Sequence, residues 1–349
     1  MSHRQRLASL LHQTGVVRAA LALRSTVVAP WLTILTYHRF PEPSGIELFD
    51  DEIADVTLDA FERQLASLRP HFTFIGVEEL CAFARGEGLP PNAVAITFDD
   101  GYLDNYTRAF PLLKRYGAKA TFFLSTDYIG ERRVYWWDRV AYIVKRSSES
   151  QLVLDYPFRL EIPLANRRQA IERVLRVVKT HAELDVERFL GELARAARVA
   201  WSRSLERAFA DRLLMTWDHV RELRAGGMDV ESHTRTHRVL QTLSPSELDR
   251  ELAGSKADLT RELGVPPRAV AYPVGNPLPR VSPIRDALER AGYEIGLTNC
   301  TGSNPTQDRV DRYNLKRQCL GLNLSEDYLL AMLTMPALAP RQWWEAAHP

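Results

Sequence analysis

Cysteine is scarce in this sequence. The 349 residues hold only three, Cys81, Cys300 and Cys319, and no two of them form a Cys-x-x-Cys pair. An odd number of widely spaced cysteines argues against a disulfide framework and against a zinc knuckle. The pattern favours free thiols in a reducing compartment.

Net charge and long apolar runs are lacking as well. A formal net charge of +1 gives no electrostatic reason to expect a nucleic-acid partner. The longest apolar run near the N-terminus, roughly 27–35, contains Pro30 and is too short to span a bilayer. Arg18 and Arg24 interrupt the region in which a signal peptide would have its apolar core. We therefore expect a cytoplasmic protein.

The first 29 residues form a candidate helical extension. Apolar residues recur there at helical spacing, with arginines between them: Leu7, Leu10, Leu11, Val17 and Leu21. Such a helix packs on its own domain or lies on a membrane surface. Both interpretations stay open, so peripheral membrane association is a possible further property of the chain.

Strand-like segments alternate with helix-like segments along most of the chain. Strands are expected at 31–37, 93–98, 118–126, 228–232, 269–273 and 293–298, and helices at 57–70, 103–117, 215–227, 244–264 and 282–292. This alternation predicts parallel βαβ units, and hence a barrel or a doubly wound sheet. Residues 131–213 break the pattern and predict a mostly helical insertion, with a short polar or strand segment near 150–162.

Two stretches carry residues suited to chemistry, and each follows a predicted strand. "TFDDGY" places Asp99 beside Asp100, and "ESHTRTH" places His233 four residues before His237. Neighbouring carboxylates repel unless a cation relieves them. Since the ends of parallel strands share one face of a sheet, the two stretches can meet. Two imidazoles and one carboxylate with open positions are typical of a catalytic metal site.

These stretches also resemble a known family. In order along the chain, "TFDDGY", "SHTRTH" and "AYPVG" are similar to three signature motifs of the polysaccharide deacetylases, the NodB-homology group of carbohydrate esterase family four. "ILTYHR" upstream resembles a subgroup with an extra leading strand. The resemblance implies an α/β fold, a distorted (β/α) barrel of the polysaccharide deacetylase type, over 30–335, with 131–213 inserted in it.

The resemblance also implies roles for individual residues. Asp100, His233 and His237 would bind a divalent cation, with zinc as the expected ion, and Asp99 would be the general base. The turn Tyr272–Val274, through Tyr272, Pro273 and above all the N–H of Val274, would stabilise the oxyanion of an amide undergoing hydrolysis.

The sequence departs from the family pattern at three positions, and other residues would have to take over the roles that are lost there. Ala271 stands where the family has an arginine that steers the base, Val274 replaces an aromatic residue, and 296–299 lacks the histidine that acts as general acid. We expect Arg317 to replace the arginine, with a surface salt bridge as the alternative. We expect His38 to be the acid, with a strand-end histidine bonded to backbone as the alternative.

The implied function is metal-dependent hydrolysis of N-acetyl groups on a glycan or a lipid-linked glycan precursor. Two alternatives stay open: hydrolysis of a small amide or ureide, and carbohydrate binding without catalysis. The aromatic run Tyr135–Trp137 at the start of the insertion either lines a sugar groove or anchors the insertion to the core. The oligomeric state is not predicted.

Overall fold

The computed structural model describes residues 3–26, 31–40, 48–50, 56–306, 310–321 and 324–335, and the side chains of 3, 4 and 24–26 are not described. Trp343 and Trp344, which the sequence does not place in any element, lie outside the described residues. None of the described helices is both long and apolar enough to cross a membrane.

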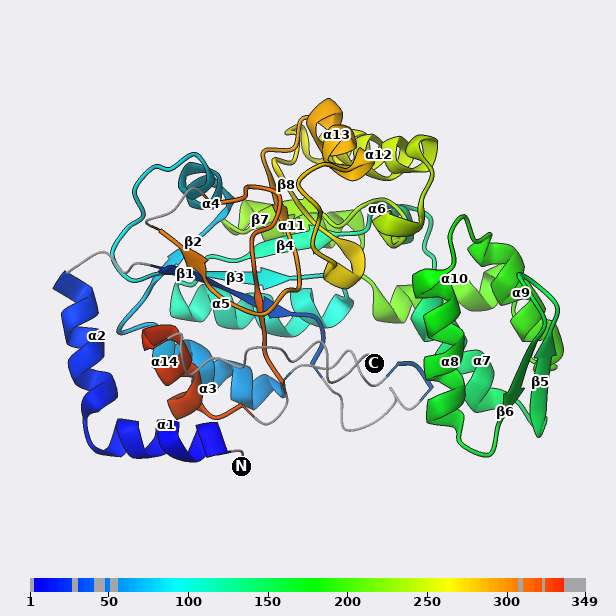
Figure 1. Cartoon of the computed structure of the whole chain (residues 1–349), viewed down its shortest axis with the longest axis horizontal. Coiled ribbons are helices and arrows are strands. Elements are labelled where there is room, and N and C mark those ends of the chain that lie inside the picture. Colours follow the sequence, from blue (N-terminus) through cyan, green and yellow to red (C-terminus); the bar gives the residue numbers. More distant parts are fainter. Residues whose placement is uncertain are drawn as a thin grey trace.

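The central sheet is mostly parallel and curls into a barrel (Figure 1). Its main path runs β10 (Asn304–Pro305), β1 (Trp31–Tyr37), β3 (Ala93–Phe98), β4 (Thr121–Leu124), β7 (Asp229–Ser232), β8 (Ala269–Ala271) and β9 (Ile295–Leu297), while β2 (Thr73–Ile75) pairs with β3. Leu315 forms a parallel bridge with Leu297 of β9, and β11 (Gln318–Cys319) pairs in parallel with β1. Residues 315–319 therefore join the two sides of the sheet, which confirms the barrel-type fold.

Helices cover the outside of this sheet. They are α3 (Leu58–Leu68), α4 (Val77–Ala84), α5 (Phe110–Tyr116), α6 (Thr126–Gly130), α11 (Trp217–Ala225), α12 (Pro245–Leu263), α13 (Pro283–Ala291) and α14 (Glu326–Thr334). The bounds of α3, α11, α12 and α13 are close to those expected. α5 begins later than expected, after a π-helical turn at Asn105–Ala109, and α4, α6 and α14 were not predicted. Thr57 caps α3 by accepting a hydrogen bond from the Ala60 N–H, and Ser244 with Glu247 forms a capping box on α12. Gly264 ends α12 at φ +73°, where glycine carries no steric cost.

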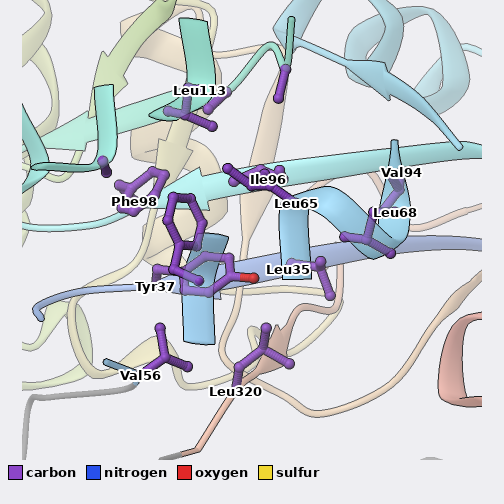
Figure 2. Packing of buried hydrophobic residues seen from close by; sticks show 14 of the residues in the cluster. Leu35, Tyr37, Val56, Leu65, Leu68, Val94, Ile96, Phe98, Leu113 and Leu320 are labelled. Carbon is purple, nitrogen blue, oxygen red and sulfur yellow. The ribbon is translucent and has the colours of Figure 1, made fainter. Parts of the chain in front are cut away.

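The core between the sheet and α3 is aromatic and aliphatic (Figure 2). All six residues of β3 are buried, as expected for a strand covered on both faces. The ring of Phe98 stacks between Tyr37 and Phe122, with centroids 5.3 and 5.0 Å away. Leu65 and Leu68 of α3 pack against the same cluster. This packing holds the ends of β1 and β3 side by side, where the candidate residues begin.

The insertion has its own apolar core beside the barrel (Figure 1). It consists of α7 (Trp136–Arg146), the hairpin β5 (Gln151–Leu154) and β6 (Leu160–Pro163), α8 (Arg167–Thr180), α9 (Val186–Ala196) and α10 (Arg203–Leu213). Trp136 and Trp137 are only 3% and 5% exposed, and Tyr135 is fully buried. This burial favours the alternative in which the rings anchor the insertion to the core.

The N-terminal extension is two helices, where the spacing of its leucines suggested one. α1 (His3–Gln13) and α2 (Val16–Thr26) are separated by Gly15, whose φ of +79° interrupts the helix. Both helices contact α14. Ala8, Val17 and Leu21 are buried in the main core, while the outer face of α1 leaves Leu7 and Leu10 exposed.

Candidate active site

The candidate residues lie at one end of the barrel, at the carboxyl ends of the parallel strands. Asp99 and Asp100 follow β3, His233 follows β7, and the turn 272–274 follows β8. The N–H of Asp99 donates to the carbonyl of Tyr37 at the end of β1, which places His38 beside it. The expectation that separate strand ends meet at one site is met by the geometry.

Asp100, His233 and His237 form a compact group of three buried ligand atoms, all within 4.8 Å of one another. Asp100 Oδ1 lies 3.5 Å from His233 Nε2 and 3.3 Å from His237 Nε2. The two Nε2 atoms are 3.1 Å apart. Three ligand atoms facing a common point from two strand ends is the arrangement that a metal ion requires.

The surroundings of these atoms fit a divalent cation. Asp100 Oδ1 is buried without a hydrogen-bond partner, and such an atom is costly unless something pairs with it. His233 Nδ1 lies 2.8 Å from the carbonyl of Ala271, a contact that orients the ring and leaves Nε2 to act as a ligand. Burial lowers the pKa of His233 to about 4, so its imidazole is neutral at physiological pH. A neutral imidazole is the form that binds metal.

Asp99 is fully buried and held by Arg317. The guanidinium donates two hydrogen bonds to it, from Nη1 to Oδ1 at 2.8 Å and from Nη2 to Oδ2 at 2.7 Å. Burial alone would raise the pKa of Asp99, but the charge and hydrogen bonds of Arg317 outweigh it and hold that pKa well below its usual range. Arg317 is itself fully buried, so the alternative of a surface salt bridge is wrong.

His38 lies beside Asp99, at the edge of the candidate site. Its Nε2 lies 3.8 Å from Asp99 Oδ2, the oxygen that also accepts from Arg317 Nη2, and its side chain is 17% exposed. His233 Nε2 is 3.9 Å from the same oxygen. Asp99 Oδ2 therefore lies within 4 Å of both the metal-ligand group and a partly solvent-accessible histidine.

The turn after β8 has one unusual residue and one that faces away. Val274 has φ +64°, a conformation that β-branched residues rarely adopt. Tyr272 is buried in an apolar cluster behind the strand, and its hydroxyl donates to the carbonyl of Tyr313. The Tyr272 side chain therefore points away from the site, and any part of Tyr272 in oxyanion binding falls to its backbone. Pro273 is buried at the start of the turn. The backbone of 272–274 is therefore the part of the turn that could bind an oxyanion.

Several residues at this end of the barrel have a strained backbone conformation. Of the eight described residues other than glycine with positive φ, four belong to the site or its loops: Asp100, Thr234, His237 and Val274. Such conformations persist only where the surrounding structure enforces them, and they are common at functional sites.

Three residues that support the site were not expected to do so from the sequence: Asn299, Trp137 and Tyr135. Asn299 Oδ1 accepts a hydrogen bond of 2.6 Å from Arg317 Nη2, so it helps to aim the guanidinium at Asp99. Asn299 lies two residues after Leu297, at the position where the family has its acid histidine. This match to a family position was the one feature of the sequence that could have identified Asn299. Trp137 packs on His237 with ring centroids 4.4 Å apart, and the Tyr135 hydroxyl donates to the carbonyl of Asp100.

Parts of this chain are similar in sequence to known proteins. In curated sequences, 210 residues are 24% identical to YxkH of Bacillus subtilis, covering 60% of this chain and 46% of that protein. A stretch of 116 residues is 29% identical to the poly-β-1,6-N-acetyl-D-glucosamine N-deacetylase of Staphylococcus aureus, covering 31% of this chain and 40% of that protein. This chain thus spans less than half the length of these relatives.

Solved structures share the fold. The Streptococcus pyogenes deacetylase PplD in complex with acetate superposes with a TM-score of 0.57 at 22% identity, covering 87% of this chain and 99% of that one. IcaB from Ammonifex degensii gives 0.54 at 20% identity, covering 88% and 98%. At these identities the likeness concerns the fold.

The family model described as "Polysaccharide deacetylase" matches residues 86–153 and 169–296, which is more than half of the chain. The matched ranges contain both carboxylates and both histidines of the site. Members of this family are hydrolases that act on carbon–nitrogen bonds. The chain belongs to the polysaccharide deacetylase family.

Proposed function

We propose that this protein hydrolyses N-acetyl groups on a glycan or on a lipid-linked glycan precursor. The observation that carries the proposal is the position of Asp99, buried between the Asp100–His233–His237 group and the guanidinium of Arg317. A carboxylate kept ionised beside a metal site is what an amide hydrolase needs as a general base. The name of the Staphylococcus aureus relative, a poly-β-1,6-N-acetyl-D-glucosamine N-deacetylase, supports an N-acetylated sugar polymer as the substrate class.

Asp100, His233 and His237 would hold the divalent cation, and their nitrogen and oxygen ligands suit zinc. When bound, such an ion lowers the pKa of water and polarises a carbonyl group. Asp99 would take a proton from the attacking water, since the pKa of this carboxyl is held low and the group is ionised at neutral pH. The N–H of Val274 would donate to the oxyanion of the tetrahedral intermediate.

His38 would deliver a proton to the leaving nitrogen. An amide cannot release an unprotonated amine easily, and His38 is the histidine nearest to Asp99 outside the metal-ligand pair. We expect His38→Ala to lower kcat by about 10²-fold or more with little change in KM, because general acid catalysis contributes roughly 10²–10⁴-fold. Hydrolysis of an aryl acetate, whose leaving group needs no proton, should suffer far less.

The matched control for this variant is His71→Ala, which alters an exposed histidine elsewhere. An unchanged amide kcat in His38→Ala, or an equal loss on the amide and on the aryl acetate, would dismiss His38 as the acid.

Acetate release from N-acetylglucosamine oligomers is the direct test of the proposed function. We expect release that a chelator abolishes and that added zinc restores. Release from small amides or ureides but not from the oligomers would favour the small-molecule alternative. Oligomer binding without any acetate release, in protein with a full complement of metal, would favour a carbohydrate-binding role.

Membrane association and a cytoplasmic location stay predictions. The outer face of the N-terminal helices supports the first, since Leu7, Leu10, Val16 and Leu23 are 43–66% exposed there and residues 1–41 contain no Asp or Glu. Exposed apolar residues beside arginines suit an anionic lipid surface. Co-sedimentation with anionic but not with neutral vesicles is the expected result, and its absence would leave α1 and α2 as packing elements alone.

A further inference from the structure

The loop from His233 to His237 carries both imidazoles of the candidate metal site. Two of its residues, Thr234 and His237, have a left-handed backbone with φ of +65° and +52°. The N–H of His233 donates to the carbonyl of Leu124, and the N–H of Thr234 donates to the hydroxyl oxygen of Ser232. Because residues other than glycine keep such a conformation only where their surroundings enforce it, the second half of the loop needs support as well.

Glu251, a buried residue of α12, supports that second half. Its Oε2 accepts hydrogen bonds from the Arg235 N–H at 2.9 Å and from the Thr236 N–H at 2.8 Å. Its Oε1 accepts from the Thr236 hydroxyl. Because Glu251 is only 6% exposed, bulk water cannot easily replace it as an acceptor. A single carboxylate therefore fixes the two residues that come directly before His237.

The ring of His237 depends on this support more than the ring of His233 does. Nδ1 of His233 contacts the carbonyl of Ala271, whereas Nδ1 of His237 is buried without a hydrogen-bond partner in the part of the chain that the structure describes. A metal-bound histidine is usually oriented by a hydrogen bond at its second nitrogen. For His237, orientation instead comes from packing on Trp137 and from the backbone that Glu251 holds.

We propose that Glu251 is a positioning residue for the metal site, acting on His237 through the backbone of the loop. The inference rests on the metal site of the proposed function and adds to it a residue outside the motif "SHTRTH". Without the carboxylate, two N–H groups and one hydroxyl lose their acceptor directly before a left-handed residue. His237 Nε2 is then no longer fixed 3.3 Å from Asp100 Oδ1, and the ion keeps two well-placed protein ligands in place of three.

The test compares zinc Kd values of metal-stripped variants, measured by competition with a chromogenic chelator at a temperature where every variant is folded. Glu251→Ala should raise the Kd about 10–100-fold, which is the usual cost of losing a group that orients a metal ligand. Glu251→Gln should restore most of the affinity, because its amide oxygen still accepts from the two N–H groups and its NH₂ group donates to the Thr236 hydroxyl. Thr236→Val removes only the hydroxyl bond and should raise the Kd less than Glu251→Ala does.

The matched control is Asp249→Ala on the same helix. It removes an exposed carboxylate that is paired with Arg290, and it should leave the zinc Kd unchanged. The unfolding midpoint of the metal-free protein separates positioning from a purely structural role. A lower midpoint in Glu251→Ala with a wild-type Kd would show that Glu251 only stabilises the fold, and it would overturn the inference. A Kd in Glu251→Gln as weak as in Glu251→Ala would overturn it too.

Zinc binding is measured without substrate, so this inference and the proposed function fail separately. Wild-type protein that binds zinc but releases no acetate overturns the proposed reaction alone. Acetate release by the wild type, together with a zinc Kd that Glu251→Ala does not change, overturns the role of Glu251 alone.

Discussion

His233→Ala should lose both its bound metal and its acetate release, whereas Asp99→Asn should keep the metal and lose only the acetate release. The difference follows from geometry, because His233 Nε2 is one of three ligand atoms within 4.8 Å of one another, while both oxygens of Asp99 are engaged by Arg317. Losing one of three protein ligands leaves a site too poor to retain the ion. Losing the general base costs roughly 10²–10⁴-fold in kcat.

The choice of substitutions matters because two ligands have a left-handed backbone. Asp100 and His237 have φ of +73° and +52°, where asparagine is tolerated far better than alanine. Asp100→Asn and His237→Asn are therefore the matched variants for the other two ligands, and His233→Ala needs no such precaution. Metal analysis of dialysed protein reads out the result. Equal loss of metal from Asp99→Asn and from the ligand variants would contradict the division between ligand and base.

Arg317→Gln should impair both folding and catalysis. The substitution leaves a fully buried carboxylate without its cation, and breaking one side of a buried ion pair costs about 3–5 kcal/mol. With the largest opposing charge gone, burial raises the pKa of Asp99, so the base is ionised only at higher pH. We expect the acid limb of the kcat/KM profile to move to higher pH. The loss of unfolding free energy should be largest at high pH, since protonation of Asp99 relieves the unpaired charge.

The control for Arg317 is its neighbour. Lys316→Gln alters an exposed residue on the same segment and should change neither the unfolding midpoint nor the pH profile. Arg317→Lys should give an intermediate result, because lysine keeps the charge but cannot form the paired hydrogen bonds of a guanidinium. A wild-type acid limb in Arg317→Gln would show that another group holds the pKa of Asp99 low.

Much of the site was predictable because its ligands lie in short local motifs at strand ends. Asp99 and Asp100 are adjacent, His233 and His237 are four residues apart, and parallel strands bring such ends to one side of the sheet. The helix boundaries at Thr57 and Ser244 were predictable for the same reason, since a cap depends on residues within one helical turn.

The remaining features depend on contacts between distant residues. Arg317 follows Asp99 by 218 residues, and its burial beside that carboxylate is set by the barrel closing through 315–319. The sequence allows Tyr272 to face the site, but the alternation of a strand and its turn directs this ring into the cluster behind β8. Trp136 and Trp137 have the composition of a sugar platform, and only the packing of the insertion reveals them as an anchor.

Metal titration of chelator-stripped wild-type protein tests most directly whether three side chains, at the end of β3 and in the loop after β7, hold one ion beside an ionised Asp99. We predict that acetate release is absent from stripped protein and returns in proportion to added zinc, up to one equivalent per chain. In His233→Ala the same titration should restore nothing. Full acetate release by the stripped protein, or normal restoration in His233→Ala, would contradict this prediction.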